Sequence, residues 1–116
     1  MSQYHEPVEE LNADDRNYVR ALNSLKEEIE AVNWYHQRVA ACKDESLKAI
    51  LAHNRDEEIE HAVMTIEWLR RNMPAWDEEL RTYLFTEGDI TALEEGEEGE
   101  GSGAGASDLG VGSLKK

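Results

Sequence analysis

Glu58 and His61 stand three positions apart in a segment whose apolar residues repeat with a helical spacing. Residues three apart are neighbours on one helix face, so this carboxylate and this imidazole could bind one metal ion together. Helical bundles that bind two iron ions typically use two Glu-x-x-His pairs and one further glutamate from each of two other helices. The chain contains one such pair, which is half of the Glu-x-x-His pairs in that set. A complete site therefore requires a second copy of the chain.

Glu28 is the carboxylate best placed to join this pair. At about 100° per residue it falls on a row with Leu25 and Val32, at the shoulder of the apolar face of an earlier helical segment. It stands near the middle of its segment, as Glu58 does, so an antiparallel hairpin would bring the two carboxylates close together. Two such hairpins would supply four carboxylates and two imidazoles, a ligand set that suits two iron ions.

The same spacing allows other interpretations. A salt-bridged Glu58 and a hydrogen-bonded His61 at a wet seam between helices would look identical in sequence, because E-x-x-H is a short and common pattern. A different metal grip would use Glu57 with His61, or His53 with Glu57. This grip ranks lower because positions 53 and 57 point away from the central apolar row.

A second group of residues faces elsewhere on the first helical segment. Glu27, Glu30 and Trp34 share a face, and two carboxylates one turn apart could bind a cation weakly. The alternative is a solvated face, or a helix-pairing surface that buries Trp34. Tyr35 projects close to Glu28, where it could donate a hydrogen bond beside the metal ligands or simply fill the core.

Three helices must position these residues. The apolar spacing predicts helices over about residues 7–41, 45–71 and 74–85, with Pro7 in the first turn and Asp44 as an N-cap. Two long helices with a short joint form an antiparallel hairpin, which cannot bury its apolar faces alone. The predicted fold class is therefore all-α, with a hairpin, a short C-terminal helix and a four-helix bundle completed by dimerisation.

The composition changes after the third predicted helix. Residues 87–116 hold all eight glycines of the chain, and acidic residues crowd the first part of this stretch. We expect a helical body at residues 1–86, a flexible acidic glycine-rich linker at 87–106 and a docking peptide at 107–116. The last segment, SDLGVGSLKK, carries isolated apolar residues that could dock in a groove on a partner.

The overall composition narrows the function classes. The 116 residues suffice for one small domain, and the net charge of −14 argues against nucleic-acid binding. No stretch approaches the roughly 18 apolar residues of a membrane span, and the N-terminal residues lack the features of a secretory signal. The single cysteine rules out an intrachain disulfide framework. These features predict a cytoplasmic protein.

Three sequence blocks together resemble the encapsulated ferritins, which are ferritin-like proteins carried inside encapsulin nanocompartments. The blocks are LKEEIEAVNWYHQR at 25–38, ILAHNRDEEIEHAVMTIEWLRRN at 50–72 and LRTYLFTEG at 80–88. The resemblance covers roughly residues 5–90. The segment 107–116 is similar to the cargo-loading peptides that dock on the inner wall of encapsulin shells.

This resemblance implies a ferroxidase that oxidises Fe(II) to Fe(III) with oxygen at a di-iron centre formed between two subunits. It implies two irons for each pair of subunits, a ring-shaped decamer built as a pentamer of dimers, and iron storage inside the encapsulin shell. Carried over by position, the resemblance implies that the iron ligands are Glu28, Glu58 and His61. It implies a secondary metal site at Glu27, Glu30 and Trp34, and a tyrosine near the di-iron centre at Tyr35.

The second function hypothesis belongs to a different class. In it the chain is a non-catalytic helical cargo or adaptor protein, and its Glu and His residues only satisfy a polar seam between helices. An adaptor predicts an oligomer that is indifferent to iron, whereas an intersubunit metal site predicts assembly or stabilisation that depends on metal.

Overall fold

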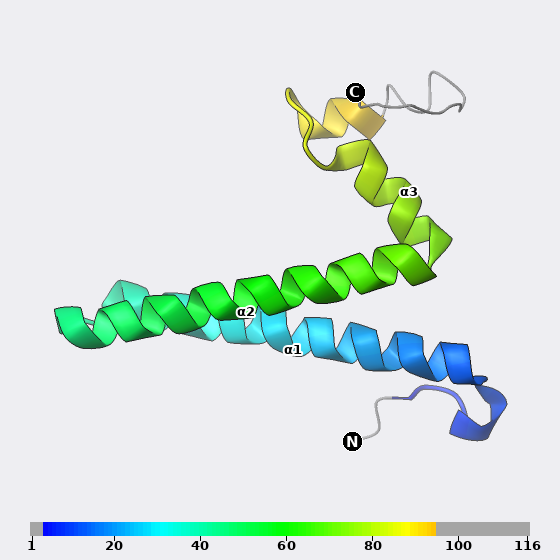
Figure 1. Cartoon of the computed structure of the whole chain (residues 1–116), viewed down its shortest axis with the longest axis horizontal. Helices are drawn as coiled ribbons and strands as arrows, with labels where there is room; N and C mark the ends of the chain where they lie inside the picture. The colour runs from blue at the N-terminus through cyan, green and yellow to red at the C-terminus, as the bar shows by residue number, and fades with distance from the viewer. Residues whose placement is uncertain (1–3, 95–116) are drawn as a thin grey trace. The chain divides into compact units, whose positions relative to one another are not determined.

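The computed structural model describes residues 4–94, and within them every regular element is helical. The prediction of an all-α fold is confirmed. A short 3-10 helix comes first, followed by the three α-helices labelled in Figure 1: η1 (Val8–Glu10), α1 (Ala13–Ala41), α2 (Glu45–Asn72) and α3 (Pro74–Tyr83). None of the described helices combines the length and the apolar character that a membrane span requires.

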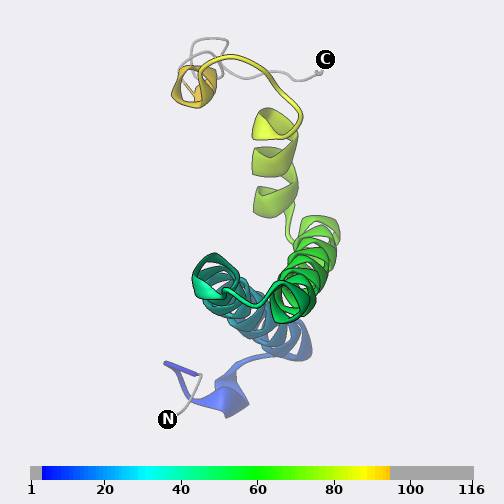
Figure 2. The same cartoon turned by 90° about the vertical axis from the view of Figure 1, so that its left-hand side faces the viewer.

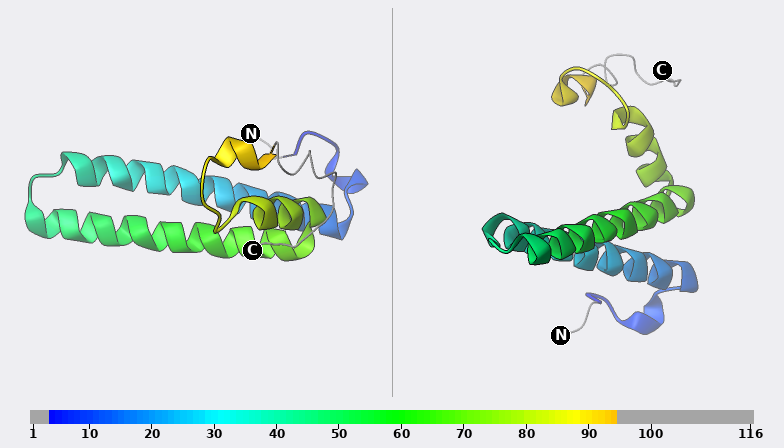
Figure 3. Two further views of the ribbon diagram at one scale, coloured as in Figure 1. Left: turned by 90° about the horizontal axis from the view of Figure 1, so that it is seen from above. Right: turned by 60° about the vertical axis from the view of Figure 1, so that its left-hand side comes forward.

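The described residues divide into two compact units, one that ends at Leu69 and one that begins at Arg70. The first unit is an antiparallel hairpin in which α1 and α2 run side by side, as Figure 1 and the left panel of Figure 3 show. Figure 2 looks along this pair from the end where α1 passes into α2. The predicted hairpin is therefore confirmed, and it is the element that positions the candidate metal ligands.

The first long helix begins later than the sequence predicted. Pro7 precedes only the single turn of η1, and α1 starts after Asn12. The Asn12 side chain accepts a hydrogen bond from the Asp15 amide at 2.7 Å, and the Asp15 carboxylate accepts one from the Asn12 amide at 3.3 Å. This reciprocal capping box satisfies two amides that the first helical turn leaves free, which outweighs the helix-starting preference of Pro7.

The second helix begins and ends close to the predicted positions. The Asp44 carboxylate accepts a hydrogen bond from the Ser46 amide at 3.2 Å, and the Asp44 carbonyl accepts one from the Lys48 amide at 2.8 Å. Asp44 therefore caps α2, as its residue type predicts. Only residues 42–44 separate the two long helices, and this short joint forces them into an antiparallel arrangement.

The hairpin buries very little. Among the described residues only Leu25, Ala62 and Leu69 are buried apolar side chains. Large apolar side chains on both helices remain exposed, including Ile29, Ile50, Ile59, Val63 and Met64. One hairpin thus leaves its apolar faces open, as expected of half of a four-helix bundle.

The second unit contains α3, where Pro74 occupies the first helical turn. The Asp77 carboxylate accepts hydrogen bonds from Arg70 at 2.6 Å and from Arg81 at 2.9 Å. Burial acts to raise the pKa of Asp77, but the hydrogen bonds and charges of the two arginines outweigh it and hold that pKa below its usual range. This ion-pair network joins the last turn of α2 to α3.

The third helix ends at Tyr83, so the prediction that it reaches Phe85 was wrong. The Leu84 amide donates to the Leu80 carbonyl at 2.9 Å and closes the last turn, and Phe85 then turns into the left-handed region with φ 61°. Such a left-handed residue commonly follows the C-cap of a helix, although glycine is its usual occupant.

Helical structure resumes at residues 90–94, within the segment for which the sequence predicts a flexible linker. The Asp89 carboxylate accepts hydrogen bonds from the Thr91 amide at 3.3 Å and from the Thr91 hydroxyl at 3.1 Å. No glycine interrupts residues 89–95, which allows Asp89 to cap a turn of helix here. The remainder of the predicted linker and the predicted docking peptide at 107–116 lie outside the described residues.

Candidate metal centre

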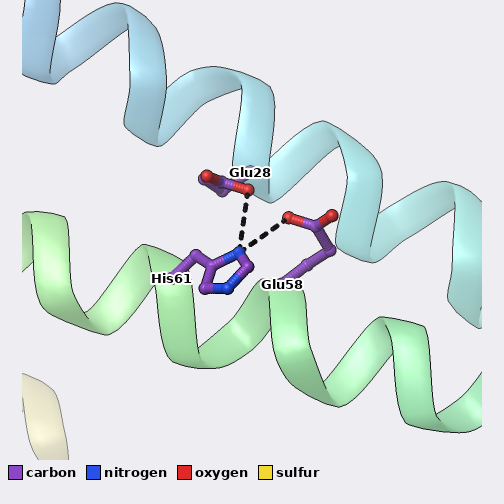
Figure 4. A group of neighbouring side chains, drawn as sticks. All are labelled: Glu28, Glu58 and His61. Atoms are coloured by element: carbon purple, nitrogen blue, oxygen red, sulfur yellow. Dashed lines mark ion pairs between the residues drawn. The ribbon is translucent and has the colours of Figure 1, made fainter.

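The three residues singled out by their spacing meet on one side of the hairpin. Glu28 lies near the middle of α1, and Glu58 and His61 lie one turn apart near the middle of α2. Because the helices are antiparallel, their midpoints come together. Figure 4 shows the three side chains converging across the seam between the helices.

The distances within this group suit a single metal ion. His61 Nδ1 lies 3.6 Å from Glu58 Oε1 and 4.0 Å from Glu28 Oε1, and one potential ligand atom from each of the three residues falls within 4.8 Å of the others. Protein ligands hold a transition-metal ion at about 2.1 Å, so two ligands of one ion lie at most about 4.2 Å apart. Both imidazole–carboxylate distances are too long for hydrogen bonds and fall within this limit.

The site is accessible to ions from solvent. The side chains of Glu28 and Glu58 are 27% and 26% exposed, and that of His61 is 42% exposed. Partial burial removes much of the hydration of the carboxylates, while the remaining exposure leaves a path for a cation. Carboxylates in such surroundings require a compensating partner.

The pKa of Glu28 shows that the two carboxylates interact. A hydrogen bond with the Glu58 carboxyl is the main cause that raises the pKa of Glu28, followed by burial and by the negative charge of Glu58. The charge of His61 acts in the opposite direction. A raised pKa means that the ionised form of Glu28 is disfavoured when no cation is bound. A divalent ion bound between the carboxylates of Glu28 and Glu58 would offset their mutual repulsion and favour the ionised form of both.

A second group of possible ligands overlaps the first at His61. Ligand atoms of Glu57, Glu60 and His61 also lie within 4.8 Å of one another. Glu57 and Glu60 are exposed and all three residues belong to α2, whereas the Glu28 group spans both helices and is half-buried. The sequence pattern predicted a possible grip by Glu57 and His61. It did not single out Glu60, although Glu60 stands one turn after Glu57 and could have been added on that basis.

The predicted secondary site is an exposed face of α1. Glu27, Glu30 and Trp34 all lie on the surface, and Trp34 is 51% exposed. Within the described residues, neither Glu27 nor Glu30 joins a cluster of three potential ligands in one chain. The charge of Glu27 nevertheless contributes to the raised pKa of Glu28. Metal binding by Glu27, Glu30 and Trp34 therefore stays a prediction.

Tyr35 is half-buried on α1, two turns after Glu28. The guanidinium carbon of Arg38 lies 5.0 Å from the centre of the Tyr35 ring, within the range of a cation–π contact. Any hydrogen bond from the Tyr35 hydroxyl to the metal ligands therefore stays a prediction.

A contact between Arg55 and His36 joins the two long helices, and the sequence pattern did not predict it. Arg55 Nη1 on α2 lies 3.1 Å from His36 Nδ1 on α1, and Arg55 Nε lies 3.1 Å from the Asp56 carboxylate. An arginine can only donate, so the facing nitrogen of His36 accepts and its proton sits on the other nitrogen. This pair crosses the seam one turn before Glu58 and ties the two helices that carry the metal ligands.

Two curated relatives match the chain over nearly its whole length. The chain is 66% identical over 109 residues to a ferritin-like protein of Thermotoga maritima, with 94% of this chain and 95% of the relative covered. It is 58% identical to an encapsulated ferritin-like protein of Rhodospirillum rubrum, with 96% of this chain and 86% of the relative covered.

A solved structure shows the same helical arrangement. The crystal structure of a protein from Nitrosomonas europaea is 60% identical, superposes with a TM-score of 0.74, and matches over 77% of this chain and 98% of its own length. The EncFtn-like family matches residues 3–87, which include the whole hairpin and α3. The resemblance to the encapsulated ferritins is confirmed, and the chain belongs to the EncFtn-like family.

Proposed function

We propose that this protein is a ferroxidase that oxidises Fe(II) to Fe(III) with oxygen at a di-iron centre shared by two copies of the chain. The observation that supports this function is the convergence of Glu28, Glu58 and His61 across the hairpin, within ligand distance of a single ion. Carboxylates and imidazole are the ligands that iron uses in helical bundles. Cysteine, which structural zinc sites favour, is absent from the group.

One chain provides only half of the ligands. Two hairpins contribute two copies each of Glu28, Glu58 and His61, enough for two irons per pair of subunits. The exposed apolar side chains of α1 and α2 support this pairing, because a second hairpin would cover them. We extend this proposal, on the basis of family membership, to a ring of five such dimers, which is a decamer.

The protein side chains bind the substrate iron and set its electrostatic surroundings. The carboxylates of Glu28 and Glu58 offset the positive charge of the ions and favour the ferric product, which carries more charge than the ferrous substrate. His61 provides one nitrogen ligand in each chain. Each iron gives up one electron, and oxygen accepts the electrons together with protons from water.

We propose that the protein works inside an encapsulin shell in the cytoplasm, where the oxidised iron is stored. The name of the Rhodospirillum rubrum relative, an encapsulated ferritin-like protein, supports this location. Residues 107–116 would dock on the inner wall of the shell, and the segment before them would act as a tether to the helical body at residues 1–86. Glu27, Glu30 and Trp34 would form a secondary metal site where copies meet.

The test compares two glutamates of α2 in an Fe(II) oxidation assay. Glu58→Ala removes a proposed ligand, whereas Glu60→Ala removes an exposed carboxylate two residues further along the same helix. Loss of an outer-shell partner already costs roughly 10- to 100-fold at metal sites, so Glu58→Ala should slow oxidation at least about tenfold. Glu60→Ala should retain most of the rate. Equal rates for the wild type and Glu58→Ala would favour the adaptor function.

A further inference from the structure

Phe85 combines two unfavourable features in the single chain. Its backbone has φ 61°, and its side chain is 100% exposed. The left-handed conformation is unfavourable for a residue with a Cβ atom. Full exposure also forgoes the stabilisation that burial of a phenyl ring provides. A strained backbone and a fully exposed ring at the same residue indicate that Phe85 contacts something outside its own chain.

Local hydrogen bonds fix Phe85 at the tip of a turn. The Thr86 hydroxyl donates to the Tyr83 carbonyl at 2.7 Å, and the Leu84 amide closes the last turn of α3. Gly88 then adopts φ 88°, which a glycine tolerates without strain. We call residues 84–87 the Phe85 tip. Its exposed acidic member is Glu87.

A shallow groove of about 470 Å³ lies on the hairpin and is lined by both long helices. Ala21 and Ser24 line the groove on α1, and the apolar parts of Met64 and Trp68 line it on α2. Met64 is 57% exposed and Trp68 is 36% exposed. A thioether and an indole both make favourable contacts with a phenyl ring. The groove therefore suits an aromatic anchor.

The charges of the groove and of the Phe85 tip are opposite. Arg20 lines the groove and donates one hydrogen bond to Asn17 at 2.7 Å, which leaves other N–H groups of its guanidinium available. Glu87 lies two residues after Phe85 and is exposed. In a chain with a net charge of −14, a basic group beside an apolar groove favours an acidic partner segment.

We propose that the Phe85 tip of one copy inserts into the Arg20–Trp68 groove of a second copy, with Glu87 facing Arg20. The groove contains none of Glu28, Glu58 and His61, so this contact is separate from the shared metal site and does not depend on it. A single aromatic anchor buries roughly 150–250 Å², less than a stable interface needs, so it adds to the pairing of hairpin faces. A head-to-tail contact repeated from copy to copy closes a ring when the rotation between successive copies allows it.

Cross-linking between two single-cysteine chains tests the contact directly. One full-length chain carries Cys42→Ser with Leu84→Cys beside the anchor, and the other carries Cys42→Ser with Ser24→Cys in the groove. Mixing them under mild oxidation should give an intermolecular disulfide. The yield should fall at least about tenfold when Phe85→Ala is added to the first chain, because the anchor contributes most of the contact energy.

Three results would overturn the contact. One is an unchanged yield with Phe85→Ala. Another is an equal yield when the second chain carries Glu60→Cys, on an exposed face of α2, in place of Ser24→Cys. The third is a cross-link that forms only after deletion of residues 107–116, because the groove would then belong to the chain's own C-terminal segment.

A charge exchange gives an independent measurement on the metal-free protein. Sedimentation velocity should show weaker association, by about 10- to 100-fold in Kd, for Phe85→Ala. Arg20→Glu and Glu87→Arg should each weaken association, and the double variant should recover most of the loss. A double variant as weak as the sum of the two single variants would contradict the pairing of these charges, and an unchanged Kd for Phe85→Ala would contradict the whole contact.

Discussion

Glu28 on α1 and His61 on α2 meet across the hairpin, with 4.0 Å between Glu28 Oε1 and His61 Nδ1. This separation is too long for a hydrogen bond but matches two ligands on either side of one ion. The two residues come from different helices, so the hairpin itself sets their distance. The fold therefore brings together the potential ligands of the candidate metal site.

Removal of the Glu28 charge should separate stability from metal binding. The pKa of Glu28 is raised in the folded chain, so its ionised form destabilises the fold once the pH exceeds that raised pKa. Glu28→Gln should therefore leave Tm equal or higher in a chelator at neutral pH. It should also abolish the rise in Tm with Fe(II) under anaerobic conditions, which for the wild type corresponds to about 2.7 kcal/mol at a hundredfold excess over Kd.

The matched control for Glu28 is Glu27→Gln, which changes an exposed carboxylate on the neighbouring position of α1. It should keep the increase in Tm with Fe(II). A Glu28→Gln protein that is stabilised by Fe(II) as strongly as the wild type would exclude Glu28 from the ligand set.

The link between Arg55 and His36 should stabilise the hairpin without taking part in iron oxidation. His36→Ala removes the acceptor that faces Arg55 and should lower the free energy of unfolding by about 0.5–1.5 kcal/mol. His53→Ala, on an exposed position of α2, is the control and should have little effect. Urea denaturation measures both variants. A loss of stability that is the same in the two variants would show that the interhelical contact contributes nothing.

Asp77 should hold α3 in place over a defined pH range. Its pKa in the folded chain is lowered, so its pairing with Arg70 and Arg81 stabilises α3 fully above the usual carboxylate range. This stabilisation is lost as the pH falls through the lowered pKa. Solvent screens this partly exposed network, so Asp77→Asn should cost α3 about 0.5–1 kcal/mol.

Hydrogen exchange of the amides in residues 74–83 measures the contribution of Asp77. Exchange should speed up severalfold in Asp77→Asn at neutral pH, while Glu78→Gln, an exposed neighbour, should match the wild type. Identical exchange in all three proteins would mean that the ion pairs do not stabilise α3.

Deletion of residues 107–116 should separate loading from chemistry. The shortened chain should no longer copurify with an encapsulin shell protein when the two are expressed together, because the proposed docking peptide is gone. Its rate of Fe(II) oxidation should match that of the full chain. A loss of oxidation together with loading would show that this segment is needed for the assembly that forms the site.

The sequence predicted the parts of the site that depend on local spacing. Glu58 and His61 follow from a three-residue interval, and Glu28 follows from its place on the apolar row of its own helix. The hairpin follows from the apolar periodicity and from the short joint capped by Asp44. Each of these features is a property of one helix or one turn.

The features that the sequence did not predict depend on competition between two helix-start signals, or on how the turns of α1 and α2 align with each other. The start of α1 required a choice between Pro7 and the capping box at Asn12, and only the box satisfies two amides at once. The contact between Arg55 and His36 depends on which turns of the two helices lie opposite each other. The apolar pattern of its neighbours predicted Phe85 inside the third helix. The structure instead places it after the end of α3, in an exposed and left-handed conformation.

The central claim is that Glu28, Glu58 and His61 from two chains hold the substrate iron. Crystals of the full-length protein soaked anaerobically in Fe(II), with diffraction data collected above and below the iron absorption edge, test it most directly. The account predicts two anomalous peaks between paired hairpins, each within about 2.5 Å of ligand atoms from both copies. Iron held only by Glu57, Glu60 and His61 of a single chain, or no peak at the seam, would contradict it.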